Sequence, residues 1–139
     1  MIVDGAIPMH KILASVNDPA AGGVSLFAGT VRDHNEKGPV HQIRYESYKE
    51  MAEDVMSEIQ QEMRAKWKLN KIAIIHRIGT LNVGEASVVV AVSSEHRREA
   101  FEACMYGINN IKTRVPIWKK EFMESGEVWV EGTLPKCDV

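Results

Sequence analysis

The sequence contains few cysteines: Cys104 and Cys137 are the two among its 139 residues. Neither belongs to a CxxC pair or has metal-ligand spacing, which argues against a disulfide scaffold, thiol chemistry and a zinc site. We expect Cys104 to be a buried helix residue. The formal net charge is −2, so the sequence also lacks the basic excess of a general nucleic-acid binder. Any anion that this chain binds should therefore be small and held locally.

Long hydrophobic runs are also absent, and no stretch approaches the length of a membrane span. The first residues have neither the basic nor the apolar region of a signal peptide. These two observations predict a cytoplasmic protein in a reducing compartment. No repeat, low-complexity segment or linker divides the sequence, and its hydrophobic fraction of 45% can supply one sizeable core. We therefore expect a single domain over residues 1–139.

Hydrophobic periodicity predicts three helices, a short one over residues 8–16 and two long ones over 49–67 and 95–112. The pair Ser93-Ser94 offers a cap for the start of the third helix. Pro116 should end that helix, because proline cannot donate a backbone hydrogen bond and disfavours helix in the residue before it.

Between these helices, β-rich segments predict paired strands. We expect strands at 24–31, 40–48, 71–78 and 86–92, and a hairpin of 117–123 with 127–131. Residues 32–38 are predicted to be a polar loop and residues 79–84 a turn. The resulting order, α-ββ-α-ββ-α-ββ, predicts an α+β domain with a mainly antiparallel sheet and two long helices.

The segment 112–121 carries an unusual concentration of positive charge for a chain that is slightly acidic. Four cations stand within nine residues: Lys112, Arg114, Lys119 and Lys120. The residues between them include Val115, Pro116, Ile117 and Trp118, which belong in a packed region. Cations held by a rigid apolar frame can receive an anion or act as amines of lowered pKa. A helix end with lysines directed to solvent is the alternative for this segment.

Lys112 and Lys119 can meet only if the chain bends sharply at residues 114–116. If they meet, each lowers the pKa of the other, and a neutral amine becomes available as a base or nucleophile.

Two further segments have the chemistry of an anion site. Arg32 follows the strand 24–31 and offers a planar guanidinium that suits phosphate or carboxylate, while Gly29 permits close backbone approach. His96 and Arg97 stand at the start of the third helix, where free N–H groups and the helix dipole favour an anion. We interpret the pair His76-Arg77 as structural, because nothing else in the sequence converges on it.

Taken together, five segments resemble the large subunit of molybdopterin synthase (the MoaE family). They are residues 27–32, 76–79, 94–97, 112–121 and 129–131. The resemblance extends from about residue 20 to residue 131, with the motifs in matching order and spacing. It implies an α/β hammerhead-type fold and a homodimer in which each subunit binds one small ubiquitin-like sulfur carrier, forming a heterotetramer.

The resemblance also implies a reaction. The carrier ends in Gly-Gly, and its C-terminal thiocarboxylate enters a pocket of the large subunit. Two sulfur transfers then convert cyclic pyranopterin monophosphate (precursor Z) into the dithiolene of molybdopterin, with no metal or other cofactor. The implied substrate-binding residues are Thr30, Val31, Arg32, His96, Arg97, Lys112, Lys119, Lys120 and Glu121.

The resemblance also suggests separate roles within this set. Arg32, His96 and Arg97 would hold the pterin phosphate. The catalytic residues would be Lys119, for acid–base work at the sulfurated carbons, and Lys112, which orients the thiocarboxylate or briefly bonds to it.

Two other functions use the same residues. A non-catalytic sensor of nucleotides or phosphate would use Arg32, His96 and Arg97 but would not need both lysines. An RNA-binding role for residues 112–120 is poorly supported, because aromatic residues make up 6% of the chain and its net charge is negative.

Overall fold

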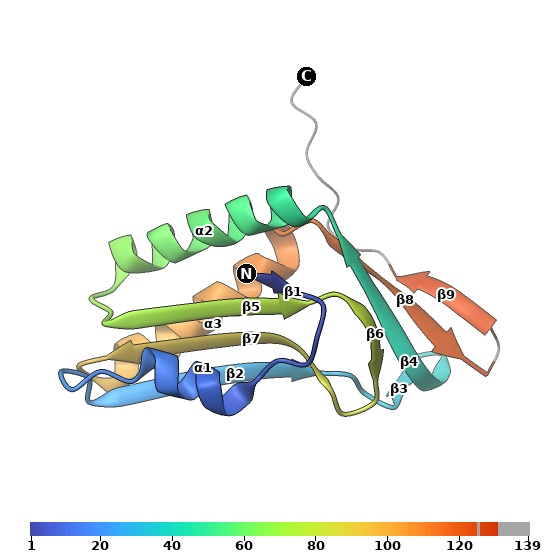
Figure 1. Cartoon of the computed structure of the whole chain (residues 1–139), viewed down its shortest axis with the longest axis horizontal. Helices are drawn as coiled ribbons and strands as arrows, with labels where there is room; N and C mark the ends of the chain where they lie inside the picture. The colour runs from blue at the N-terminus through green and yellow to red at the C-terminus, as the bar shows by residue number, and fades with distance from the viewer. Residues whose placement is uncertain (125, 131–139) are drawn as a thin grey trace, which may run out of the picture.

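A computed structural model describes residues 1–124 and 126–130, and its first sheet forms the centre of the molecule (Figure 1). The strands of this sheet, in spatial order, are β1 (Ile2–Val3), β5 (Lys71–Arg77), β7 (Ala86–Ser94) and β2 (Gly23–Thr30). β1 pairs with β5 in parallel, and the other pairs are antiparallel. β7 lies in the middle and is buried along almost its whole length, as expected for an apolar strand covered on both faces.

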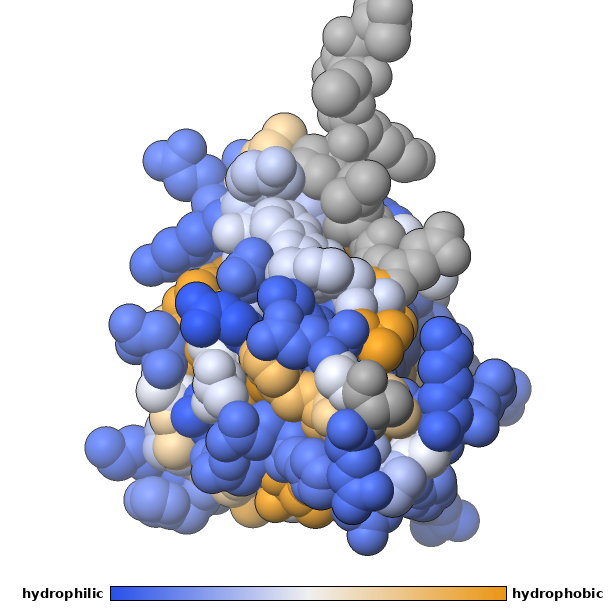
Figure 2. Space-filling model, turned by 90° about the vertical axis from the view of Figure 1, so that its right-hand side faces the viewer, coloured by the Kyte–Doolittle hydropathy of each residue, from blue (hydrophilic) through white to orange (hydrophobic). Residues whose placement is uncertain are grey.

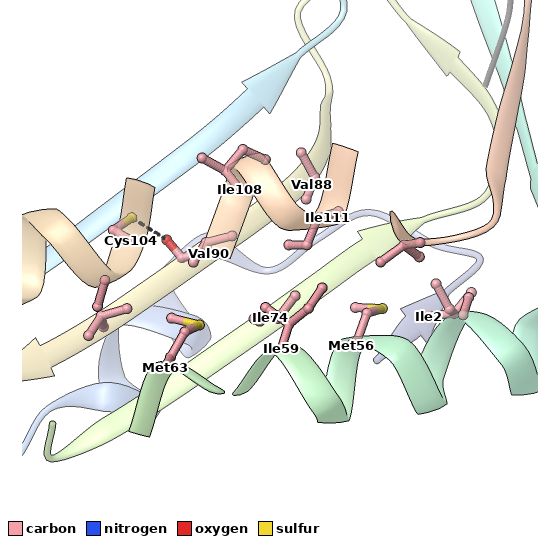
Figure 3. Packing of buried hydrophobic residues seen from close by; sticks show 14 residues of the cluster. Ile2, Met56, Ile59, Met63, Ile74, Val88, Val90, Cys104, Ile108 and Ile111 are labelled. Atoms are coloured by element: carbon pink, nitrogen blue, oxygen red, sulfur yellow. Dashed lines mark hydrogen bonds between the residues drawn. The ribbon is translucent and has the colours of Figure 1, made fainter. Parts of the chain in front are cut away.

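Helices cover both faces of this sheet. Two long helices, α2 (Lys49–Lys66) and α3 (Arg97–Arg114), pack on one face, and the short helix α1 (Met9–Val16) packs on the other. The main core lies between the long helices and the sheet, where side chains of α2, α3, β5 and β7 interdigitate (Figure 3). Its labelled members include Met56, Ile59, Met63, Ile74, Val90, Ile108 and Ile111. Cys104 is buried in this core, as predicted, and Cys137 lies outside the described residues.

A second sheet stands across one end of the first (Figure 1). Its strands are β3 (His34–Asn35), β4 (Gly38–Ser47), β8 (Ile117–Met123) and β9 (Gly126–Val130), in that order, and β6 (Gly79–Asn82) also pairs with β4. All of these pairs are antiparallel. The α+β architecture and the mainly antiparallel pairing are therefore confirmed.

Several local predictions were wrong. The predicted turn 79–84 contains β6, and the predicted loop 32–38 contains β3, because both short segments find partners on β4. Ser93 and Ser94 do not cap the third helix but complete β7, and α3 begins at Arg97 after His96. The Ser94 hydroxyl donates instead to the carbonyl of His96, at 2.5 Å.

The helices of the described ranges do not include one that is both long and apolar enough to cross a membrane.

Candidate functional site

The chain bends at the end of α3, as the sequence suggested. The helix ends at Arg114, Val115 has extended backbone, and β8 starts at Ile117. Lys112 lies in the last turn of the helix and Lys119 lies in β8, and both side chains line the same two cavities. The bend therefore brings together two amines that are seven positions apart in sequence.

The first cavity, which we call the outer cavity, has a volume of about 370 Å³. Charged and polar side chains from four segments line it: Thr30, Arg32, His34, Lys112, Lys119 and Glu121. Figure 2 shows the end of the molecule that carries the second sheet, where hydrophilic residues surround a small hydrophobic area. Three cations converge here in a chain whose net charge is −2, so the positive charge is local.

Lys119 has an environment that favours its neutral form. Burial lowers the pKa of its amine, and the nearby charges of Lys112 and Arg32 lower it further. Glu121 acts in the opposite direction, with its carboxylate 3.7 Å from Lys119 Nζ. The net result is a lysine whose pKa lies below its ordinary value, which is the direction that favours a base or proton donor.

Glu121 is a buried carboxylate with two partners. Besides the amine of Lys119, the side-chain amide of Asn35 donates a hydrogen bond to its Oε2. Asn35 reaches this position because β3 folds back on β4, where Gly38 has a φ of +132° that favours glycine. Sequence reasoning missed Asn35, although the Lys37-Gly38 pair was a signal for this hairpin.

The second cavity, the inner cavity, has a volume of about 260 Å³ and adjoins the first. Tyr45, Ser87, Lys112 and Lys119 line both cavities and so form their boundary. The remaining walls of the inner cavity are mostly apolar and include Val88, Ile111, Val115 and Ile117. Of the two cavities, therefore, the inner one is the less polar.

Tyr45 stands directly opposite Lys119 in the ladder between β4 and β8. Side chains at such paired positions are neighbours on one face of the sheet. Burial raises the pKa of the Tyr45 hydroxyl, and a hydrogen bond with Ser87 acts in the opposite direction. Ser87 in turn donates to the carbonyl of Gly29, at 3.2 Å. These hydroxyls therefore link the second sheet to the first behind the two lysines.

His76, which we interpreted from the sequence as structural together with Arg77, also lies in this region. It is buried, lines the inner cavity and makes an edge contact with the ring of Tyr45, with ring centres 5.2 Å apart. Burial lowers the pKa of its imidazole to about 4. Residues 76–79 carry part of the family resemblance, but no local pattern placed His76 at a cavity, because this cavity forms only when α3 and β8 pack over the end of β5.

Gly29 explains how β2 can line the outer cavity. A Cβ atom at this position would lie 2.8 Å from Cγ1 of Val88, closer than side chains tolerate. Glycine thus allows β2 to pair closely with β7 immediately before Thr30 and Arg32.

Other predicted site residues point elsewhere. Val31 packs in a hydrophobic cluster with Val40 and Leu81, and its amide donates to the carbonyl of Glu85. Lys120 alternates with Lys119 along β8 and so faces the opposite side, where it pairs with Glu127 at 2.9 Å and lies over the ring of Trp129. Among the described cavity-lining residues, neither Val31 nor Lys120 appears.

His96 and Arg97 lie far from both cavities of the same chain. They start α3, whereas Lys112 is in its last turn, and an 18-residue helix is about 27 Å long. The His96 side chain is exposed and lines a separate surface pocket beside Trp67 and Glu99. A single chain therefore gathers Thr30, Arg32, Lys112, Lys119 and Glu121, but not this pair.

Within residues 1–124 and 126–130, there is no group of three or more His, Cys, Asp or Glu side chains that could hold a metal ion.

Comparisons with known proteins agree with this architecture. The profile of the family described as "MoaE protein" matches residues 2–114. A relative from Oryza sativa named "Molybdopterin synthase catalytic subunit" is 46% identical over 127 residues, which are 91% of this chain and 66% of the relative. A protein of the same name from Pyrococcus abyssi is 43% identical over 124 residues, covering 89% of this chain and 84% of its own length.

Solved structures share this architecture. The crystal structure of "Molybdopterin Synthase from Staphylococcus aureus" has a TM-score of 0.89 and 37% identity, covering 94% of this chain and 95% of its own. A "complex of subunit 1 and 2 of Molybdopterin-converting factor" from Helicobacter pylori has a TM-score of 0.76. That chain is 18% identical and covers 94% of this chain and 88% of its own, so this likeness concerns the fold alone. The present chain spans about two thirds of the length of the Oryza relative.

Proposed function

Because this chain belongs to the MoaE protein family, we propose that it is the catalytic subunit of a molybdopterin synthase. In this role it transfers sulfur from the thiocarboxylated C-terminus of a small ubiquitin-like carrier to cyclic pyranopterin monophosphate. The product is the dithiolene of molybdopterin. The observation that supports this best is the convergence of Lys112, Lys119 and Arg32 on one cavity, beside the buried Glu121.

The geometry suits two anionic reactants. Arg32 offers a guanidinium to the pterin phosphate, and Lys112 offers an ammonium to the thiocarboxylate. Lys119 lies in the boundary between the two cavities, and its pKa is lowered by burial, so it is placed to move protons at the carbons that receive sulfur. Glu121 holds the Lys119 amine in place through their ion pair.

Replacing Lys119 by alanine tests this assignment. We expect Lys119→Ala to lower the rate of molybdopterin formation at least ~100-fold, the lower range of a general acid–base contribution. The assay uses the full chain, thiocarboxylated carrier and the pterin substrate. The matched control is Lys120→Ala, which removes the adjacent amine from the opposite face of β8 and should change the rate by less than about threefold. Near-normal turnover of Lys119→Ala would overturn the assignment.

The carrier distinguishes this function from a phosphate or nucleotide sensor. A synthase subunit should bind a ubiquitin-like protein that ends in Gly-Gly, whereas a sensor should bind common nucleotides tightly without one. Calorimetry with each ligand separates the two. The cytoplasmic location stays a prediction.

We propose that a homodimer brings His96 and Arg97 to the site of the neighbouring copy. The edge strand β2 begins beside Arg97, where a Cβ on Gly23 would lie 3.4 Å from the Arg97 Cα, and ends at Thr30 on the outer cavity. If two copies place their β2 edges side by side and antiparallel, a two-fold axis brings Arg97 of one copy towards Arg32 of the other. His96 and Arg97 would then hold the phosphate in the neighbouring subunit's site.

The surface beside β2 suits such a partner. Phe101 and Met105, on the flank of α3 away from α2, are 65% and 63% exposed, and Phe27 of β2 is 38% exposed. Large apolar side chains gathered along a free sheet edge are typical of a protein interface. We therefore propose this flank and the β2 edge as the contact between copies.

A further inference from the structure

Asn35 contacts the site from outside its cavities. It is not among the described residues that line the outer and inner cavities, but its side-chain amide donates a hydrogen bond to Oε2 of Glu121. The same Nδ2 group lies 3.4 Å from Sδ of Met123. Asn35 thus joins β3 to two residues that share one face of β8.

A second hydrogen bond fixes the orientation of the Asn35 amide. The backbone N–H of Lys37 donates to Oδ1 of Asn35, at 2.7 Å. Because a backbone N–H can only donate, Oδ1 is the acceptor in this turn, and Nδ2 faces Glu121. Asn35 therefore presents a hydrogen-bond donor to the carboxylate, from a position that the hairpin of β3 and β4 sets.

The ion pair between Glu121 and Lys119 is an open one. Oε1 of Glu121 lies 3.7 Å from Lys119 Nζ, whereas a charge-assisted hydrogen bond between such groups is about 2.7–2.9 Å long. The two residues lie on the same face of β8, and Glu121 is buried. A flexible lysine beside a buried carboxylate tends to close such a gap, because the attraction between charges grows away from water. The hydrogen bond from Asn35 to Oε2 supplies a restraint on the carboxylate.

We propose that Asn35 is a positioning residue, which holds the Glu121 carboxylate away from Lys119 and so leaves the amine available at the boundary of the two cavities. Glu121 then anchors the lysine through an open ion pair rather than a closed one. The lowered pKa of Lys119 agrees with this arrangement, because a closed pair would favour the charged amine more strongly. The inference rests on the proposed function for what the amine does once it is available.

Other titratable groups surround Lys119 from several segments of the chain. Those that line the two cavities are Arg32, His34, Tyr45, His76 and Lys112. Among them, Lys112 and Arg32 lower the pKa of Lys119. The test therefore leaves all of these groups unchanged and alters only Asn35 and its partner.

Replacing Asn35 by serine removes the restraint. Asn35→Ser keeps a hydroxyl that can accept from the Lys37 N–H, but it lacks the amide donor that reaches Glu121. We expect this variant to raise the pKa of Lys119, measured by NMR titration of its side chain, because the released carboxylate closes on the amine. The kcat for molybdopterin formation should fall about tenfold, a part of a general acid–base contribution, while the KM for each reactant stays within about twofold.

The second arm makes the same substitution in the Glu121→Gln chain. There Asn35→Ser should leave the pKa of Lys119 unchanged, because the carboxylate that Asn35 restrains is absent. Glu36→Ser, at an exposed position of the same hairpin, is the matched control and should change neither the pKa of Lys119 nor kcat.

Three results would overturn the proposal. They are an unchanged or lowered pKa of Lys119 in Asn35→Ser, an equal rise in the Glu121→Gln chain, and a kcat within about twofold of the unmodified value. If Asn35→Ser does not fold, Asn35→Thr makes the same test with a side chain that suits a strand. The titration needs neither carrier nor pterin, so an unmodified chain that makes no molybdopterin would refute the proposed function and leave the titration to decide the role of Asn35.

Discussion

Lys119 shows how a single amine is adjusted by its neighbours. Burial lowers its pKa most, and the remaining influences have opposite signs: Glu121 raises the pKa, whereas Lys112 and Arg32 lower it. The Lys119 pKa should therefore respond to substitutions of side chains around it that leave the amine itself unchanged.

We expect Arg32→Gln to raise the pKa of Lys119, because a like charge is removed. Glu121→Gln should lower it, because the favourable carboxylate is lost. An NMR titration of the Lys119 side chain in each variant measures both shifts. Shifts of the same sign in the two variants would contradict the electrostatic account, and Lys120→Ala is the control for a nearby charge on the other face of β8.

His76 connects the site to the stability of the fold. Its pKa is about 4 in the folded chain and 6.5 in the ordinary reference state. Between pH 4 and pH 6.5, His76 binds a proton more readily in the unfolded chain than in the folded chain. The contribution of neutral His76 to the free energy of unfolding is therefore complete above pH 6.5 and is lost as the pH falls towards 4.

We predict that the titration of His76 lowers the free energy of unfolding by about 3 kcal/mol as the pH falls from 6.5 to 4. Urea unfolding of the unmodified chain and of His76→Gln at several pH values measures this contribution. The loss between pH 6.5 and pH 4 should be smaller in the variant by about that amount. Parallel curves for the two proteins would refute the assignment.

The packing of α3 depends on a close approach to the sheet and to α2. A Cβ on Gly107 would lie 3.1 Å from Val90 Cγ1 and 3.3 Å from Met63 Cε. The absence of a side chain at Gly107 lets α3 pack closely on β7. The last turn of α3 then places Lys112 over the end of the sheet.

Gly107→Leu should accordingly lower the free energy of unfolding by at least about 1–3 kcal/mol, because the larger side chain forces the helix away from β7. Asn109→Leu, at an exposed position of the same helix, controls for the change in helix propensity. Chemical denaturation of both variants gives the comparison. Equal stabilities would show that the contact at Gly107 can relax without cost.

The proposed dimer makes a prediction about the whole assembly. If each site takes Lys119 from one copy and Arg97 from the other, two inactive variants can restore one another. A mixed dimer of Lys119→Ala and Arg97→Ala would contain one complete site and one doubly defective site.

We expect an equal mixture of these two variants, refolded together, to recover about one quarter of the unmodified activity, since half of the dimers are mixed and each has one complete site of two. Each variant alone should stay nearly inactive. If both residues act within the same chain, the mixture should be no more active than the mean of the two variants.

Much of the architecture follows from local patterns. The periodicity of residues 49–67 and the proline at 116 were enough to predict α2 and the end of α3, because helix formation and termination depend on neighbouring residues. β3 and β6 could not be predicted in this way. Each is short, and each becomes a strand only by pairing with β4.

The sequence by itself determined the helices, the main strands and the cationic segment around Pro116, since these depend on residues near one another in the chain. The tertiary structure alone decided which groups share a cavity. Alternation along β8 directs Lys119 inward and Lys120 outward, the length of α3 separates His96 and Arg97 from the lysines, and packing over β5 places His76 at the site. These outcomes depend on contacts between distant segments, which no local pattern contains.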